Sequence, residues 1–313
     1  MIADRGTANT GHNVRSGSVA AWMVAIRPHS LLVAFSPVLV GATLGYAHAG
    51  AIDLLAAALV LGAALLVQVI TNMQNDVGYT VRGGDSSGTR TGLPRATSSG
   101  WLSVRHVRAA IVIAAVLATA LGLALVAYRG WPVLAIGVAS LAAALAYMGG
   151  PRPIAYTPLG ELTVFVFFGL VAVMGTDWVL TSTVGPVTQL AAVAIGALAA
   201  AALAVNNHRD VAHDRLVGRR TFAVTFGEQA SRRLYTLLLL GPLVLVPAMA
   251  LLGRTPALLL PLLLLPAALQ LRRDFGRCAP GVAFNEILFR TFRLELWFAA
   301  LLSAGALLGR VLG

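Results

Sequence analysis

Apolar residues fill long stretches of this chain, and short polar segments separate them. A helix needs about 20 apolar residues to cross the hydrocarbon core of a bilayer. Nine stretches of roughly that length can be read, at residues 20–47, 54–80, 104–128, 131–148, 160–180, 186–211, 231–252, 255–271 and 291–311. The pattern predicts an all-α, polytopic membrane protein with nine transmembrane helices.

The composition excludes an ordinary soluble domain. The chain has 313 residues, of which 58% are hydrophobic and 11% charged, and its mean hydropathy is +0.81. The first residues are polar and lack the apolar core of a cleavable signal peptide. We therefore expect a disordered tail at residues 1–19 and a single transmembrane domain at residues 20–313.

The basic residues indicate how the chain is oriented. All 23 are arginine, and the net charge is +11. If the N-terminus is cytoplasmic, every arginine falls on the cytoplasmic side except Arg129, Arg254 and Arg310. Cytoplasmic loops of membrane proteins carry an excess of positive charge, so we predict a cytoplasmic N-terminus. Topology then accounts for the charge, and we expect no nucleic-acid partner.

Two polar clusters interrupt the apolar pattern, each at a predicted cytoplasmic helix end. Their members recur every three or four residues, which places each cluster on one helical face: Gln68, Asn72, Asn75, Asp76 and Tyr79 in the second span, and Asn206, Asp210, His213 and Asp214 in the sixth. Carboxylate and amide oxygens of this kind suit Mg²⁺. Helix-terminal polar groups with interhelical hydrogen bonds remain the alternative.

A glycine- and arginine-rich loop follows the first cluster. Glycines let backbone amides approach an anion, and arginines can bind phosphate oxygens through two N–H groups. The residues concerned are Arg82, Gly83, Gly84, Gly88, Arg90 and Arg95, and "DRLVGRRTF" follows the second cluster similarly. These features predict a pocket for a diphosphate with a hydrocarbon tail, such as an isoprenyl diphosphate.

Several longer passages support a family resemblance. They are "AWMVAIRPHSLLVAFSPVLVG", "NMQNDVGYTVRGGD", "RTGLPRATSSGWLS", "GGPRPIAYTPLGELTVFVFFGLVAVMGTDWV" and "NNHRDVAHDRLVGRRTFAVTFG". With them the chain resembles the UbiA superfamily of intramembrane prenyltransferases, most of all its MenA branch, the 1,4-dihydroxy-2-naphthoate polyprenyltransferases of menaquinone biosynthesis. The resemblance implies a helical bundle around a central cavity and a bacterial inner-membrane enzyme whose active site faces the cytoplasm.

The resemblance also implies roles for individual residues. Two Mg²⁺ ions would hold the diphosphate of a polyprenyl donor, and an aromatic acceptor would receive the prenyl group. Asp76, Asp210 and Asp214 would be catalytic. The metal ligands would be Asn72, Asn75, Asp76, Asp210 and Asp214, and Arg82, Asp85, Arg90 and Arg95 would surround the diphosphate.

One departure from the family pattern lies in the first motif, which usually reads Asn-Asp-x-x-Asp. Tyr79 occupies the last position here, and a phenol with a pKa near 10 does not replace a carboxylate as a magnesium ligand at neutral pH. Three outcomes are open: weaker metal binding, an altered substrate or lost activity. The intact second motif and arginine loop favour a functional variant. The acceptor therefore stays open between 1,4-dihydroxy-2-naphthoate, 4-hydroxybenzoate, homogentisate and a quinolone. A transporter of an anionic solute is the alternative from another class.

Two smaller predictions concern other polar and aromatic positions. Asp177 lies near the opposite membrane face and is interpreted as an interfacial residue. Phe165, Phe167 and Phe168 either line a channel for the hydrocarbon tail or pack within the bundle.

Overall fold

The structure is a computed structural model that describes residues 14–84 and 91–312. Every regular element in these ranges is helical, which confirms the predicted all-α class. Nine segments within them are long and apolar enough to cross a membrane. The elements are α1 (Val19–Ile26), α2 (Pro28–Ala49), α3 (Leu54–Val81), α4 (Val104–Arg129), α5 (Trp131–Met148), η1 (Ile154–Tyr156), α6 (Gly160–Val164), η2 (Phe165–Met174), α7 (Gly175–Thr181), α8 (Pro186–Arg209), α9 (Val211–Leu216), α10 (Phe222–Phe226), α11 (Glu228–Leu252), η3 (Pro256–Leu264), α12 (Leu265–Arg277) and α13 (Phe284–Leu312).

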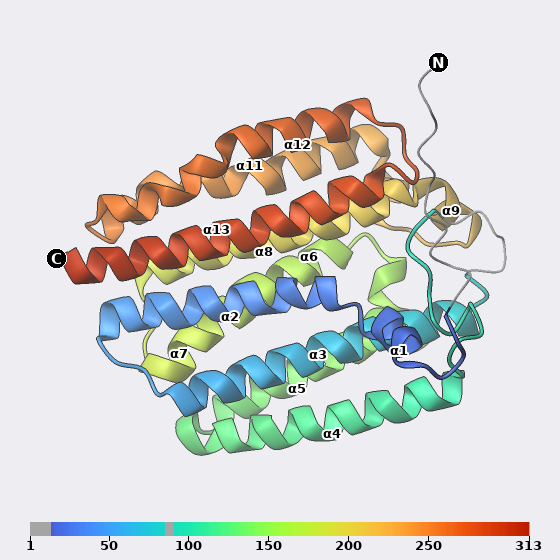
Figure 1. Cartoon of the computed structure of the whole chain (residues 1–313), viewed down its shortest axis with the longest axis horizontal. Coiled ribbons are helices and arrows are strands. Elements are labelled where there is room, and N and C mark those ends of the chain that lie inside the picture. Colours follow the sequence, from blue (N-terminus) through green and yellow to red (C-terminus); the bar gives the residue numbers. More distant parts are fainter. Residues whose placement is uncertain (1–13, 85–90, 313) are drawn as a thin grey trace.

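The long helices run side by side along the length of the molecule (Figure 1). Helices α11 and α12 form one edge of the bundle and α4 the other, with α13, α8, α2 and α3 between them. The short helices α1 and α9 lie at the end where α3 finishes, whereas α13 finishes at the opposite end. Because the described residues form an odd number of spans, nine, the chain enters the bundle at one end and leaves it at the other.

Small residues place α8 at the centre of the bundle. The spans in the described chain can be compared by how much of their most apolar 18-residue stretch is buried. The share is largest for α8, at 72%. Its alanines and Gly196 let η2 approach closely. A Cβ added to Gly196 would lie 2.6 Å from the carbonyl oxygen of Phe165 and 2.9 Å from the Cα of Gly169, so only glycine fits this helix contact without displacement.

The first span differs from its predicted range of 20–47. Arg27 has φ 55° and ψ 71°, and it divides the stretch into α1 and α2. Pro28 explains the break, because a proline ring disfavours helical geometry in the residue before it and is well placed at the first position of a new helix. The short helix α1 packs against α3, and the transmembrane helix begins only at Pro28.

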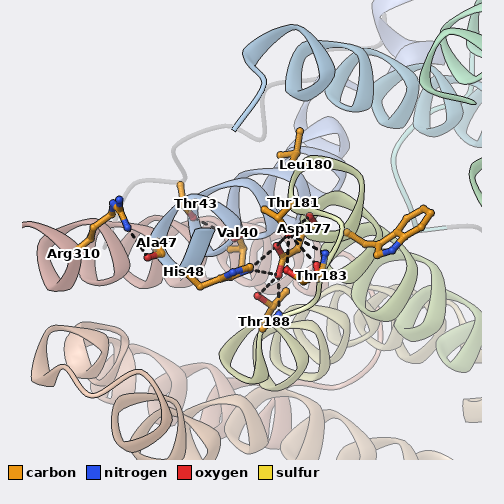
Figure 2. Close-up of polar contacts among 12 residues, drawn as sticks. Val40, Thr43, Ala47, His48, Asp177, Leu180, Thr181, Thr183, Thr188 and Arg310 are labelled. Carbon is orange, nitrogen blue, oxygen red and sulfur yellow. Dashed lines mark hydrogen bonds and ion pairs between the residues drawn. The ribbon is translucent and has the colours of Figure 1, made fainter. Parts of the chain in front are cut away.

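Asp177 holds three elements together (Figure 2), at the end of the molecule opposite α9 (Figure 1). Its carboxylate accepts hydrogen bonds from Thr188 Oγ1 at 2.6 Å, Thr181 Oγ1 at 3.1 Å and the N–H of Gly185 at 3.2 Å, and it contacts His48 Nε2 at 2.8 Å. The sequence indicated an interfacial residue, whereas the structure buries this side chain completely. The contacts join the ends of α2, α7 and α8.

Candidate active site

A cavity of about 460 Å³ lies inside the bundle. Its wall comes from α2, α3, α4, α5, α6, η2, α7, α8 and α13, together with residues of the connecting segments. Polar side chains gather among the residues near the ends of α3 and α8, namely Arg27, Gln68, Asn72, Asn75, Tyr79, Arg95, Asn206, Asn207, Arg209, Asp210 and Arg219. The remaining wall is mostly aliphatic or aromatic and includes Val38, Val60, Leu134, Phe167, Phe168 and Val179. The cavity therefore suits an amphiphile with an anionic head.

The cavity wall includes part of the first predicted cluster. Asn72 donates to Ile26 O at 2.7 Å and to Ser30 Oγ at 2.8 Å, and it accepts from Gln68 at 3.1 Å. These bonds fasten the junction of α1 and α2 against α3. The side-chain oxygen of Asn75 is buried and makes no hydrogen bond within the described residues, so it can accept a donor or a cation.

Asp76 belongs to the same cluster but lies behind the cavity wall, fully buried. Its two carboxylate oxygens accept hydrogen bonds from the N–H of Ala96 at 2.8 Å and of Thr97 at 2.9 Å, and from the Thr97 hydroxyl. The carboxylate thus fixes the backbone beside Arg95, whose side chain lines the cavity.

Arg27 also lies in the cavity wall. Burial together with the charge of Arg95 lowers the pKa of Arg27 to about 10.

The second predicted cluster straddles a helix break. Helix α8 ends at Arg209 and α9 begins at Val211, so Asp210 lies between them. Its carboxylate receives two hydrogen bonds from Arg209, at 2.9 and 2.7 Å, and lines the cavity. Asp214 lies outside the wall, fully buried, and pairs with Arg219 at 2.6 Å. Burial raises the pKa of Asp214, and Arg219 opposes that shift.

The arginines predicted to surround the diphosphate have different positions. Arg95 lines the cavity. Arg82 instead donates to the carbonyl oxygens of Met148 at 2.7 Å and Gly150 at 2.5 Å, outside the cavity wall. Asp85 and Arg90 lie outside the described residues.

Sequence reasoning gave too little weight to three cavity residues. Arg209 and Arg219 both line the cavity. Arg219 belongs to the segment "DRLVGRRTF" that helped to predict a diphosphate pocket, but neither arginine was among the predicted site residues. Tyr147, near the end of α5, also lines it and carried no distinguishing sequence signal. The signal available for the arginines was their interleaving with Asp210 and Asp214 along the chain.

The oxygen ligands at the polar end of the cavity suit a magnesium ion that is coordinated both by the protein and by a bound phosphate ligand. Among the described residues, no group of three His, Cys, Asp or Glu side chains forms a metal site by itself. Mg²⁺ is usually bound by one or two carboxylates together with substrate phosphates. The buried oxygen of Asn75 and the carboxylate of Asp210 offer hard oxygen ligands on the cavity wall.

A comparison with known families agrees with this arrangement. The model of the UbiA prenyltransferase family matches residues 34–281. The chain belongs to the UbiA prenyltransferase family. This confirms the resemblance read from the two motifs, and the enzyme class is that of the family, a membrane prenyltransferase.

Individual members of the UbiA family resemble the chain over most of its length. A 1,4-dihydroxy-2-naphthoate octaprenyltransferase of Escherichia coli (strain K12) is 38% identical over 72% of this chain and 74% of its own. The protein with the same name in Mycobacterium tuberculosis (strain ATCC 25618 / H37Rv) is 35% identical over 93% of this chain and 97% of its own.

A solved UbiA homologue has the same fold. The structure from Archaeoglobus fulgidus bound to GPP and Mg²⁺ superposes with a TM-score of 0.67 at 18% identity, covering 91% of this chain and 99% of the other. The bundle of nine candidate spans that the described residues form around a cavity thus has the UbiA fold.

Proposed function

We propose that this protein transfers a polyprenyl group from a polyprenyl diphosphate to 1,4-dihydroxy-2-naphthoate, with Mg²⁺ as cofactor. The two-part cavity carries the proposal, because arginine, asparagine and aspartate side chains line one end and apolar side chains line the rest. The names of the relatives from E. coli and M. tuberculosis support this acceptor. The A. fulgidus homologue bound to GPP and Mg²⁺ supports the donor and the metal.

We assign the metal ligands from the cavity outward. Asn75 and Asp210 would hold Mg²⁺ directly, since both line the cavity. Asn72 lines it too. Asp214 lies behind the wall, with one carboxylate oxygen bonded to Arg219 and the other without a hydrogen-bond partner among the described residues. Both oxygens of Asp76 already accept hydrogen bonds, which would have to be exchanged for a metal. When bound, Mg²⁺ neutralises charge that develops on the departing diphosphate. Arg95 and Arg219 add fixed positive charge at the same end.

The chemistry requires an electron-rich ring beside the prenyl carbon. The bond between that carbon and the diphosphate oxygen breaks, and a carbon–carbon bond forms to the ring position that carries the carboxylate. The carboxylate leaves as carbon dioxide, and its bonding electrons restore the aromatic ring. Of the three phenylalanines predicted either to line a tail channel or to pack within the bundle, Phe167 and Phe168 line the cavity and can face the cationic carbon, whereas Phe165 is outside the wall.

A transporter would place its polar groups near the membrane midplane. Here they gather where α3 and α8 end, which favours an enzyme acting at one membrane face.

We further propose that this face is cytoplasmic and that the protein lies in a bacterial inner membrane. The unequal distribution of arginines supports this orientation, and the bacterial relatives support the bacterial membrane.

The decisive experiment supplies purified protein with Mg²⁺, a labelled polyprenyl diphosphate and a panel of aromatic acceptors. We expect prenylated naphthoquinol, with no product in EDTA. Asp210→Asn should reduce kcat by at least about a hundredfold, because it removes a carboxylate ligand of the Mg²⁺ that stabilises the departing diphosphate.

Asp274→Asn is the matched control. It breaks an aspartate–arginine pair of 2.7 Å, the length of the Asp210–Arg209 pair, but lies outside the cavity wall. It should leave turnover unchanged. Prenylation of another acceptor in preference to the naphthoate would refute the acceptor assignment, and undiminished turnover of Asp210→Asn would refute the site.

A further inference from the structure

Arginine and tyrosine side chains alternate from the polar end of the cavity to the residues behind its wall. The guanidinium carbon of Arg95 lies 3.3 Å from the ring centroid of Tyr79, and that of Arg219 lies 5.1 Å from the same centroid. Arg219 is also 5.7 Å from the ring of Tyr156, which has Arg82 at 5.8 Å. We call these five residues the arginine–tyrosine ladder.

Tyr79 is the central member of the ladder. It extends from α3, whereas Arg95 comes from the segment before α4 and Arg219 from the connection between α9 and α10. The tyrosine side chain is only 4% exposed, and its hydroxyl accepts a hydrogen bond from Arg219. One side chain thus joins the segments that follow the two polar clusters.

The two arginines are held in different ways. Arg219 donates to Ala155 O at 3.1 and 3.0 Å and to Asp214 at 2.6 Å, as well as to Tyr79. Its orientation is therefore fixed. The guanidinium carbon of Arg95 lies directly over the tyrosine ring, and arginine can contact an aromatic face while its N–H groups bind phosphate oxygens. Both arginines line the cavity.

We propose that Tyr79 is a positioning residue that holds Arg95 and Arg219 as a guanidinium pair for the diphosphate of the substrate. This rests on the proposed function and adds a particular property to it. At the position where the family pattern has a carboxylate, this chain places a neutral ring that organises two cations. The head of the donor should therefore bind with measurable affinity before any metal is added.

The test is calorimetric titration of inorganic diphosphate into the purified full chain in EDTA. We expect the wild type to bind. Tyr79→Phe removes the hydrogen bond to Arg219 and should weaken binding by about fivefold. Tyr79→Leu also removes the stacked ring beneath Arg95 and should weaken it on the order of thirtyfold.

Tyr235→Phe controls for the loss of a buried tyrosine hydroxyl. Tyr235 is fully buried, bonds to Thr291 at 2.9 Å and lies outside the cavity wall, so its variant should bind diphosphate as the wild type does. Equal affinity in wild type, Tyr79→Phe and Tyr79→Leu would overturn the proposal. So would wild-type binding that appears only with Mg²⁺.

Tyr79→Asp supplies a second readout. The new carboxylate would repel the anion until a metal neutralises it, so diphosphate binding should fall in EDTA and recover with Mg²⁺ by a larger factor than in the wild type. An equal Mg²⁺ response in the two proteins would contradict this. Metal-free binding sensitive to Tyr79 in a protein that prenylates no acceptor would uphold the inference and refute the proposed function, and the reverse pattern would do the opposite.

Discussion

Asn72 and Asp76 lie one turn apart on α3, yet the structure gives their side chains different neighbours. Asn72 holds the junction of α1 and α2, and Asp76 holds the backbone of Ala96 and Thr97. Helical spacing places two residues on one face but does not determine which partner each oxygen binds. For this reason the cluster was predictable from sequence, whereas the individual contacts within it were not.

Asp76 offers a test at the residue scale. Asp76→Asn replaces an acceptor oxygen by an amide group that faces an N–H donor, so we expect a loss of about 1–3 kcal/mol in stability even without Mg²⁺. Thermal unfolding in EDTA, followed by intrinsic fluorescence, measures the effect. Unchanged stability in EDTA together with a loss of stabilisation by Mg²⁺ would show that Asp76 serves the metal instead of the backbone.

At the scale of elements, long apolar stretches predicted the spans well because burial in lipid requires them. The breaks within the spans were harder to predict. Pro28 marks the end of α1, but the apolar residues on both sides concealed it in a single stretch of 20–47. The break at Asp210 carries no proline or glycine, and the loop contacts around Arg209 and Arg219 that accompany it depend on tertiary packing.

The contact between η2 and α8 gives a prediction for paired glycine variants. Gly196→Ala places a methyl group 2.6 Å from Phe165 O, and such overpacking costs about 1–3 kcal/mol. Gly241→Ala in α11 meets nothing within 4 Å and should change stability by less than about 1 kcal/mol. Thermal unfolding in detergent compares the two variants. Equal unfolding temperatures would show that α8 and η2 can move apart to accommodate the added methyl group without loss of stability.

The whole molecule has its polar groups at one end of the cavity, and Cys278 can report which side of the membrane that end faces. Cys278 is the only cysteine in the sequence and is partly exposed between α12 and α13. We expect a membrane-impermeant thiol reagent to label it in inside-out vesicles and not in intact cells. The arginine distribution is the physical reason.

A cysteine at the other end provides the control. Ala51 is exposed between α2 and α3, so Ala51→Cys in a Cys278→Ser background should show the opposite labelling pattern. Labelling of Cys278 in intact cells would place the polar end of the cavity outside.

The buried contacts of Asp177 also affect how the bundle can widen. They tie α2, α7 and α8 together at one end of the molecule, whereas the short helices α1 and α9 lie at the other end (Figure 1). Because these contacts hold the helices together at one end, widening of the bundle would displace the helices more as the distance from Asp177 grows. Entry of a bulky donor and departure of a larger product then require little movement near Asp177 and most near the arginines.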